Sequence, residues 1–139
     1  MEDEERQFKL MCMTGLQVKH GDSVEVEGRI KFAAQKFAIN LEEDYWNIAL
    51  HFNPRFSAAE SKIVLNNMVN NAWKEEKIEK CALQHNEDFK VHIKFTKDNF
   101  EIDLGDETTM TFPNRSGLEI IEMLSISGDI QLKSVKLNK

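Results

Sequence analysis

Apolar residues occupy every second position along most of this chain, with polar or charged residues between them. Val24 and Val26, for example, alternate with Glu25 and Glu27. A period of two places successive side chains on opposite faces of a strand, so each such stretch predicts a β-strand with one solvated face. The other apolar rows are Phe37, Ile39 and Leu41; Trp46, Ile48, Leu50 and Phe52; Phe89, Val91, Ile93 and Phe95; Phe100, Ile102 and Leu104; Ile130 and Leu132.

Turn-forming residues separate these strands roughly every ten residues, which is the spacing typical of an all-β sandwich or barrel. The stretch 117–124 has mixed periodicity, and a short helical turn would fit there. No internal repeat or linker interrupts residues 8–139, which we interpret as a single domain. Residues 1–7 precede it as an acidic extension that we expect to be mobile. The turns are His20-Gly21-Asp22, Lys97-Asp98-Asn99, Gly105-Asp106 and Ser127-Gly128-Asp129.

The composition excludes several classes of protein. A formal net charge of -6 argues against nucleic-acid binding, which needs a clustered positive surface. No apolar run approaches the ~18 residues of a membrane span, so no membrane insertion is expected. The start lacks the apolar region of a signal peptide, which favours a cytosolic protein with Cys12 and Cys81 as free thiols. Neither the cysteines nor the histidines have metal-ligand spacing, so neither a metal nor a cofactor is predicted.

The segment Leu50–Phe56 carries the most informative polar residues. Alternate side chains of a strand share a face, so His51, Asn53 and Arg55 line up opposite the apolar row. An imidazole, an amide and a guanidinium together present donors and acceptors suited to a ligand rich in hydroxyl groups. The same pattern fits an ordinary solvated strand face. Pro54 cannot donate to a ladder, which indicates an edge, a bulge or a strand end.

A second polar group follows in the segment that contains Asn66, Trp73 and Glu76. Trp73 comes after an Asn-rich turn, an unusual position for a core tryptophan. An exposed indole can stack on the apolar C–H face of a sugar ring. Packing beneath a loop is the alternative for this side chain.

These motifs together resemble the signature of the galectin family, and in particular its single-domain, congerin-like fish members. The resemblance covers about residues 8–137, and it implies two antiparallel sheets in a galectin-like jelly-roll sandwich with a sugar across the concave face. It further implies that His51, Asn53 and Arg55 read the axial 4-hydroxyl of galactose. Asn66 and Glu76 would bind the 6-hydroxyl, Trp73 would stack on the ring, and Arg55 and Glu76 would pair. The matching segments are 18–22, 26–28, 51–56, 63–66, 72–76, 112–115 and 126–130.

The chain departs from the family pattern at three places. Lys74 stands where the motif has glycine, and Ile78 stands where it has an arginine that contacts the second sugar. The connection before Ile63 is short, and Glu60 is the candidate to brace the site arginine there. Lys74 is the candidate to replace the missing arginine, although it lacks the planar guanidinium. We therefore expect binding of β-galactosides with weakened or altered disaccharide specificity.

Two other classes of function compete with a lectin. The first is a galectin-fold structural or protein-interaction protein with little galactoside binding, which the loss of arginine at Ile78 favours. The second is a glycoside hydrolase, which needs two carboxyls facing each other across ~5–9.5 Å. Glu75 and Glu76 are adjacent on an expected strand and point apart, and Glu42, Glu43 and Asp44 fit a solvated turn. The chain is therefore not expected to be an enzyme.

The resemblance also predicts partners and location. We expect β-galactoside glycans of glycoproteins or glycolipids as ligands, and a homodimer formed through terminal strands. A dimer would cover an exposed sheet edge and present two sugar sites. The cytosol is the expected compartment, with an extracellular location reached by a route that needs no signal peptide.

Overall fold

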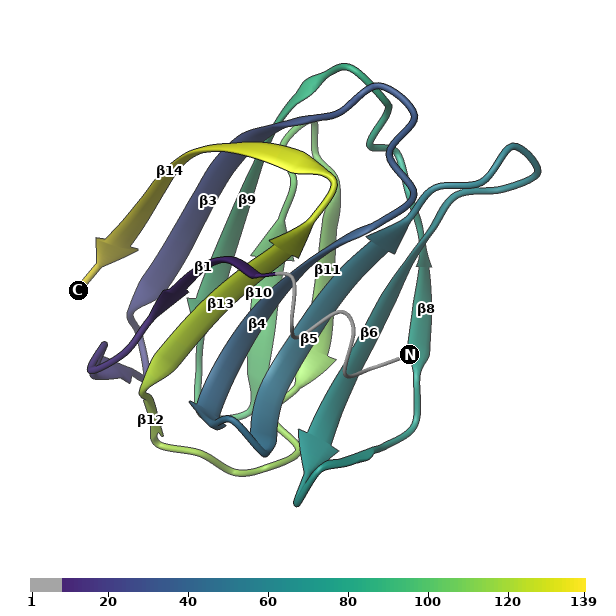
Figure 1. The fold of residues 1–139 in the computed structure, drawn as a ribbon. Helices are drawn as coiled ribbons and strands as arrows, with labels where there is room; N and C mark the ends of the chain where they lie inside the picture. The colour runs from purple at the N-terminus through teal and green to yellow at the C-terminus, as the bar shows by residue number, and fades with distance from the viewer. Residues whose placement is uncertain (1–8) are drawn as a thin grey trace.

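Two antiparallel sheets face each other and enclose the apolar side chains between them (Figure 1). The structure is a computed structural model and describes residues 9–139, so the acidic extension expected over residues 1–7 lies outside the described residues. The larger sheet contains β1 (Lys9–Met13), β13 (Met123–Gly128), β4 (Phe37–Asp44), β5 (Asn47–Arg55), β6 (Lys62–Val69) and β7 (Ala72–Trp73) in that order, with β8 (Lys77–Lys80) also paired to β6.

The second sheet has five strands, and a separate short ladder has two. The order of the five is β11 (Thr109–Pro113), β10 (Asn99–Asp103), β9 (Asp88–Phe95), β3 (Ser23–Ile30) and β14 (Ile130–Asn138). The short ladder joins β12 (Ile120–Ile121) to β2 (Val18–Lys19). The prediction of an all-β, two-sheet antiparallel sandwich is therefore confirmed.

The core between the sheets is built from the apolar rows that the alternation predicted. Each fully buried apolar side chain of this size contributes about 1.5–3 kcal/mol relative to an exposed one, so these rows carry most of the stabilisation. The largest aromatic members are Phe37, Phe52, Phe95, Phe100 and Phe112.

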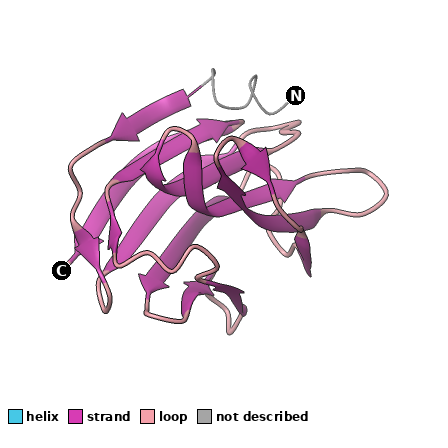
Figure 2. Ribbon diagram, turned by 90° about the horizontal axis from the view of Figure 1, so that it is seen from below, coloured by secondary structure: helices cyan, strands magenta, loops and turns pink. Residues whose placement is uncertain are grey.

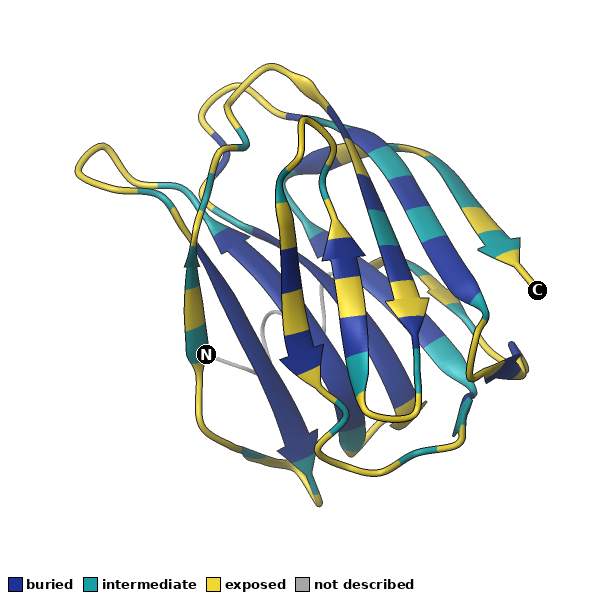
Figure 3. Cartoon of the chain, turned by 180° about the vertical axis from the view of Figure 1, so that it is seen from behind, coloured by how far each residue is buried: buried dark blue, intermediate teal, exposed yellow. Residues whose placement is uncertain are grey.

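Burial alternates in the five-stranded sheet but is continuous in the middle of the larger sheet. Figure 3 shows banded strands in the five-stranded sheet and almost uniformly buried strands in the middle of the larger sheet. All residues of β4 from Phe37 to Glu42, and of β5 from Ile48 to Pro54, are buried. The outer face of these strands is therefore not the solvated face that alternation predicts. It carries polar groups that are enclosed and hydrogen-bonded.

One predicted core row is only half correct, namely the row of Trp46, Ile48, Leu50 and Phe52. The pairing of β4 with β5 and of β5 with β6 shifts register on either side of Ile48. Such an irregularity changes which side chains share a face. Leu50 and Phe52 join the core, whereas Ile48 lies outside the core cluster and Trp46 is 52% exposed at the hairpin turn.

Two further expectations are corrected. Residues 117–124 contain no helical turn, and Figure 2 shows the described chain as strands and loops alone. Glu42, Glu43 and Asp44 do not form a turn, because β4 continues to Asp44; Glu43 and Asp44 are exposed, as expected. Glu42 is buried and accepts a hydrogen bond from Ser125, which gives this carboxylate a partner inside the sheet.

Candidate functional site

The predicted row His51, Asn53 and Arg55 lies on the outer face of β5, in the middle of the larger sheet. Leu50 and Phe52 on the same strand enter the core, so the sandwich itself orients the three polar side chains outward. Pro54 is the last residue but one of β5, which matches its expected place near a strand end.

The buried amide of Asn53 positions the guanidinium of Arg55. Asn53 is fully buried, and its Nδ2 donates to the carbonyl oxygen of Phe37 at 2.7 Å. Its Oδ1 then accepts from Nε of Arg55 at 2.8 Å. Nη2 of Arg55 lies 3.8 Å from Oε2 of Glu76, as the resemblance implies. The guanidinium is therefore aimed by a buried amide and faces a carboxylate, while 39% of its side chain stays accessible.

His51 is held by a chain of hydrogen bonds that runs across the sheet. Its Nδ1 lies 2.6 Å from Oδ1 of Asn40, whose Nδ2 donates to Oγ of Ser125 at 3.4 Å. Ser125 in turn donates to the carboxylate of Glu42. An amide oxygen can only accept, so Nδ1 of His51 carries a proton, and in the neutral imidazole the lone pair is then on Nε2.

Trp73 and Asn66 complete the same face. The indole of Trp73 is half-buried, with its ring centre 4.6 Å from that of His51 and the two planes at 51°. Its Nε1 has no hydrogen-bond partner among residues 9–139. Asn66 pairs directly with His51 across the strands, and its Nδ2 donates to the carbonyl of Lys74 at 3.0 Å. An aromatic face thus stands beside a row of directed polar groups.

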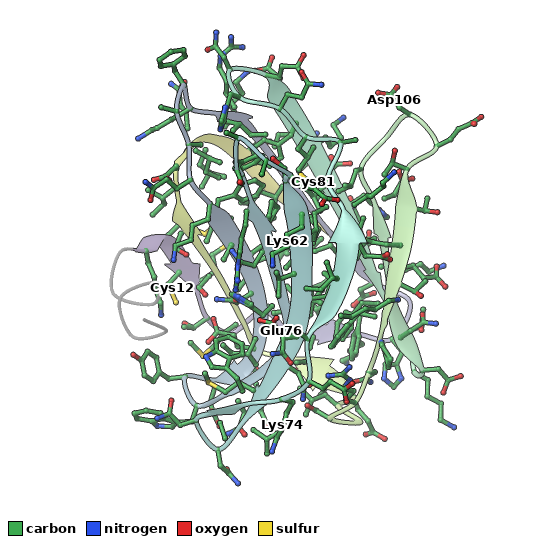
Figure 4. All side chains as sticks on the ribbon, turned by 90° about the vertical axis from the view of Figure 1, so that its right-hand side faces the viewer. Cys12, Lys62, Lys74, Glu76, Cys81 and Asp106 are labelled. Carbon is green, nitrogen blue, oxygen red and sulfur yellow. The ribbon has the colours of Figure 1, made fainter. Side chains whose placement is uncertain are left out.

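The three accessory candidates lie in different places. Ile78 pairs with Val64 and is 48% exposed on the outer face of the larger sheet. We call the part of this face that carries His51, Asn53, Arg55 and Ile78 the groove. Lys74 and Lys62 lie on opposite sides of Glu76 (Figure 4). Lys74 lines a shallow pocket with Asn67, Val69, Glu75 and Arg115 instead of approaching Ile78. Glu60 is exposed, and no ion pair joins it to Arg55 within residues 9–139.

Sequence reasoning missed the residues that support His51. Asn40 alternates with the apolar residues of its strand, so its outward direction could have been predicted. Its contact with His51 could not, because that depends on the register between β4 and β5. Ser125 comes from β13, about 85 residues away in the chain, and carried no signal at all.

The fold and the site together define a carbohydrate-binding β-sandwich. A half-buried aromatic ring offers apolar area to the C–H face of a pyranose, while the enclosed donors and acceptors beside it suit its hydroxyl groups. A charged guanidinium and carboxylate at the end of the row add the stronger, directional hydrogen bonds.

Comparisons with known proteins identify the family. The model of the galactoside-binding lectin family matches residues 7–137. Sheep galectin-1 is 37% identical over 128 residues, which cover 90% of this chain and 95% of the relative. The structure of CG-16, a homodimeric agglutinin from chicken liver, superimposes with a TM-score of 0.87 at 30% identity, covering 92% of this chain and 98% of the other. An ancestral congerin gives 0.86 at 34% identity, covering 92% and 99%.

The chain belongs to the galectin family, and it is a single-domain, β-galactoside-binding lectin of that family. The family consists of lectins without enzymatic activity. Within residues 9–139, no group of three or more His, Cys, Asp or Glu side chains is arranged to hold a metal ion. The same part of the chain has no helix of the length and hydropathy that crossing a bilayer requires.

Proposed function

We propose that this protein recognises the galactose unit of its ligands through His51, Asn53, Arg55, Asn66, Trp73 and Glu76. The observation that carries the proposal is the position of the Trp73 ring beside the oriented imidazole of His51. A galactose ring stacked on the indole would bring its axial 4-hydroxyl to Nε2 of His51, which can accept the hydroxyl proton. Arg55 can donate to the same oxygen, so one hydroxyl would have both a donor and an acceptor.

Discrimination against glucose follows from this arrangement. An equatorial 4-hydroxyl points away from the row, which leaves Arg55 and the enclosed lone pair of His51 without their ligand partners. Unsatisfied buried polar groups cost about 1–3 kcal/mol each, so the preference for the galactoside should be roughly tenfold or more.

The second sugar is where we infer altered binding. The family arginine that would contact it is absent, because Ile78 occupies that position in β8. An exposed isoleucine cannot donate to a sugar hydroxyl or to Glu76. Lys74 lies on the far side of Glu76, so its contribution to this end of the groove would be small.

Titration calorimetry with methyl β-galactoside, methyl β-glucoside and lactose tests the proposal. We expect binding of methyl β-galactoside, no measurable binding of the glucoside, and little further gain from lactose. Retention on galactose-agarose with elution by lactose is the qualitative counterpart. If neither galactoside binds a correctly folded protein, the chain is a galectin-fold structural or interaction protein, which is the competing function.

We also infer a homodimer joined through terminal strands. β1 pairs only with β13 and β14 only with β3, so each is an edge of its sheet within the described residues. Exposed edges favour pairing with a second chain. CG-16, which shares this fold, is described as homodimeric. Sedimentation velocity across a concentration series should show a two-chain species, and a single-chain species at every concentration would refute the inference.

The cytosol is the compartment that we infer, with delivery to cell-surface glycans by a route independent of a signal peptide. Cys12 and Cys81 are both free, as expected for a reducing compartment. Fractionation of cells that express the tagged chain, with and without added lactose, would separate the cytosolic pool from a surface-bound pool.

A further inference from the structure

Four cationic residues form one row across the groove, at the end that lies beyond Asn53. Lys36 bridges to Arg55, Arg55 pairs with Lys62, and Lys62 pairs with Lys80. Directly paired residues of neighbouring antiparallel strands project from the same face. Arg55 belongs to the galactose-reading face, so the whole row lies on that face.

This row is an unusual concentration of positive charge for this protein. The chain has 24 acidic and 18 basic residues, yet three basic side chains stand on the neighbouring strands β5, β6 and β8, about 4.8 Å apart, and Lys36 bridges to Arg55 just before β4. Like charges placed directly opposite each other destabilise a sheet. A negative group beside these four cations would therefore reduce the repulsion between them.

Within residues 9–139, the charges of Lys62 and Lys80 have no acidic partner. Glu76 pairs with Arg55 at 3.8 Å. The side chains of Lys62 and Lys80 are exposed, and neither forms an ion pair with any residue in 9–139. The nearest acidic residue of β8, Glu79, pairs with Lys77 at 3.9 Å. Lys77 reaches the carbonyl of Thr111 in the other sheet, so this pair lies away from the groove.

The position of the row determines which unit of a bound saccharide could reach it. His51 and Arg55 are four residues apart on one strand, which is about 13 Å and longer than one pyranose ring. The Arg55 side chain reaches back to Asn53 and can still meet a galactose stacked on Trp73, so only Lys62 and Lys80 are left to the next unit of the ligand. Ile78 is the residue before Lys80 on the same face of β8. It offers the second unit of the ligand an exposed apolar surface instead of the family arginine.

We propose that this groove favours β-galactosides whose second unit carries a negative charge, bound by Lys62 and Lys80 next to Arg55. The proposal rests on the proposed galactose recognition and specifies the ligand class of the same site. An ammonium binds a sulfate or a carboxylate as a point charge, so both anions satisfy the chemistry. The cationic row would thus replace a directional contact to neutral hydroxyls by an electrostatic contact to a charged substituent.

Two matched ligand pairs test the proposal by calorimetry at low salt. Lactobionate and lactitol share an open-chain second unit and differ in a carboxylate. N-acetyllactosamine with and without a 6-sulfate on its N-acetylglucosamine tests a sulfate ester. We expect the charged member of at least one pair to bind about fivefold more tightly, and that preference to fall at 0.5 M salt. The pair that shows it identifies the anion.

Variants assign the effect to the row. Lys62→Gln/Lys80→Gln should abolish the preference and leave lactitol affinity unchanged, whereas Lys62→Arg/Lys80→Arg should retain it. Lys94→Gln/Lys136→Gln changes the net charge equally but lies on the other sheet, and it should behave as wild type. Equal loss of the preference in both glutamine variants would overturn the proposal in favour of a general charge effect.

The outcomes also separate this proposal from galactose recognition. If neutral and charged galactosides bind equally, the proposal fails while galactose recognition stands. If no galactoside binds, galactose recognition itself fails. N-acetylglucosamine 6-sulfate alone should not bind measurably. Binding as tight as that of the sulfated disaccharide would show an independent anion site and would refute the assignment to a second sugar.

Discussion

Nδ1 of His51 lies 2.6 Å from Oδ1 of Asn40, and this contact determines which imidazole nitrogen bears the proton. Ser125 donates to Glu42 and accepts from Asn40, so each donor in this series of hydrogen bonds has one acceptor. The buried carboxylate of Glu42 thereby orients a histidine on another strand. The proposed role of His51 in reading the galactose 4-hydroxyl depends on these neighbours, because they leave the lone pair of the neutral imidazole on Nε2.

Replacing Asn40 should therefore weaken galactoside binding. In Asn40→Ala, Nδ1 of His51 loses its acceptor and the second tautomer becomes populated, which we expect to reduce affinity about threefold to tenfold. Calorimetry measures the affinity, and nitrogen chemical shifts of the imidazole report the tautomer. Ser127→Ala is the control, because Ser127 is buried on the same strand face as Ser125 without a side-chain hydrogen bond to residues 9–139. An unchanged affinity with a changed tautomer would disprove the role of Nε2.

The two tryptophans should respond differently to ligand. Trp46 lies at the β4–β5 turn and contacts Tyr45, whereas Trp73 lies beside His51. Trp46→Phe should keep the galactoside-induced change in fluorescence. Trp73→Leu should lose that change and about tenfold in affinity, because the stacking surface is removed. A ligand response that follows Trp46 would place the sugar elsewhere.

Restoring an arginine at position 78 should tighten disaccharide binding. Ile78→Arg adds donors next to Glu76 and the second sugar, and we expect about a tenfold gain for lactose with no gain for methyl β-galactoside. Ile78→Lys supplies a charge without the planar guanidinium and should gain less. Calorimetry that shows equal lactose affinity in wild type and Ile78→Arg would contradict the role assigned to this position.

Gly128 should be the glycine least tolerant of a side chain. Its φ is +106°, and an added Cβ would lie 2.5 Å from Cα of Phe37. Gly128→Ala should lower the free energy of unfolding by about 3 kcal/mol, from backbone strain and steric overlap together. Gly105 also has positive φ, at +86°, but its Cβ would meet nothing within 4 Å. Gly105→Ala should therefore cost only about 1 kcal/mol in urea unfolding, and equal losses would exclude the clash at Gly128.

The two thiols should differ in reactivity. Burial raises the pKa of the Cys81 thiol, a shift that a backbone hydrogen bond at Leu83 only partly offsets, so a smaller fraction of Cys81 is thiolate at pH 8. Cys12 is exposed on β1. We expect Cys12 to react with iodoacetamide at least about tenfold faster, as followed by peptide mass spectrometry. The rates should converge in guanidinium chloride, and a persistent difference there would point to local sequence instead of burial.

The strands and the direction of the main polar row could be predicted from the sequence. A period of two is a local property, so the outward direction of His51, Asn53 and Arg55 followed from their spacing alone. The register shift beside Ile48 is different. It depends on how two strands pair, and no residue within the apolar row marks it.

For the accessory positions, too, the sequence did not reveal contacts that depend on how the strands pair. Sequence position alone selected Glu60 and Lys74, yet no ion pair joins Glu60 to Arg55 within residues 9–139, and Lys74 and Lys62 lie on opposite sides of Glu76. The sequence does not indicate that Lys62 and Lys80 are neighbours, because they are 18 residues apart and each is an ordinary surface lysine by itself. Strand pairing places them side by side.

The sequence by itself therefore determined the all-β fold, the family and the residues expected to read galactose, because each rests on local alternation or on a contiguous motif. Only the tertiary structure decided how His51 is oriented by Asn40, Ser125 and Glu42. It alone also revealed that Lys36, Arg55, Lys62 and Lys80 form one charged row. Both features arise from register between strands distant in the chain, where the free energy of a contact depends on the whole sheet.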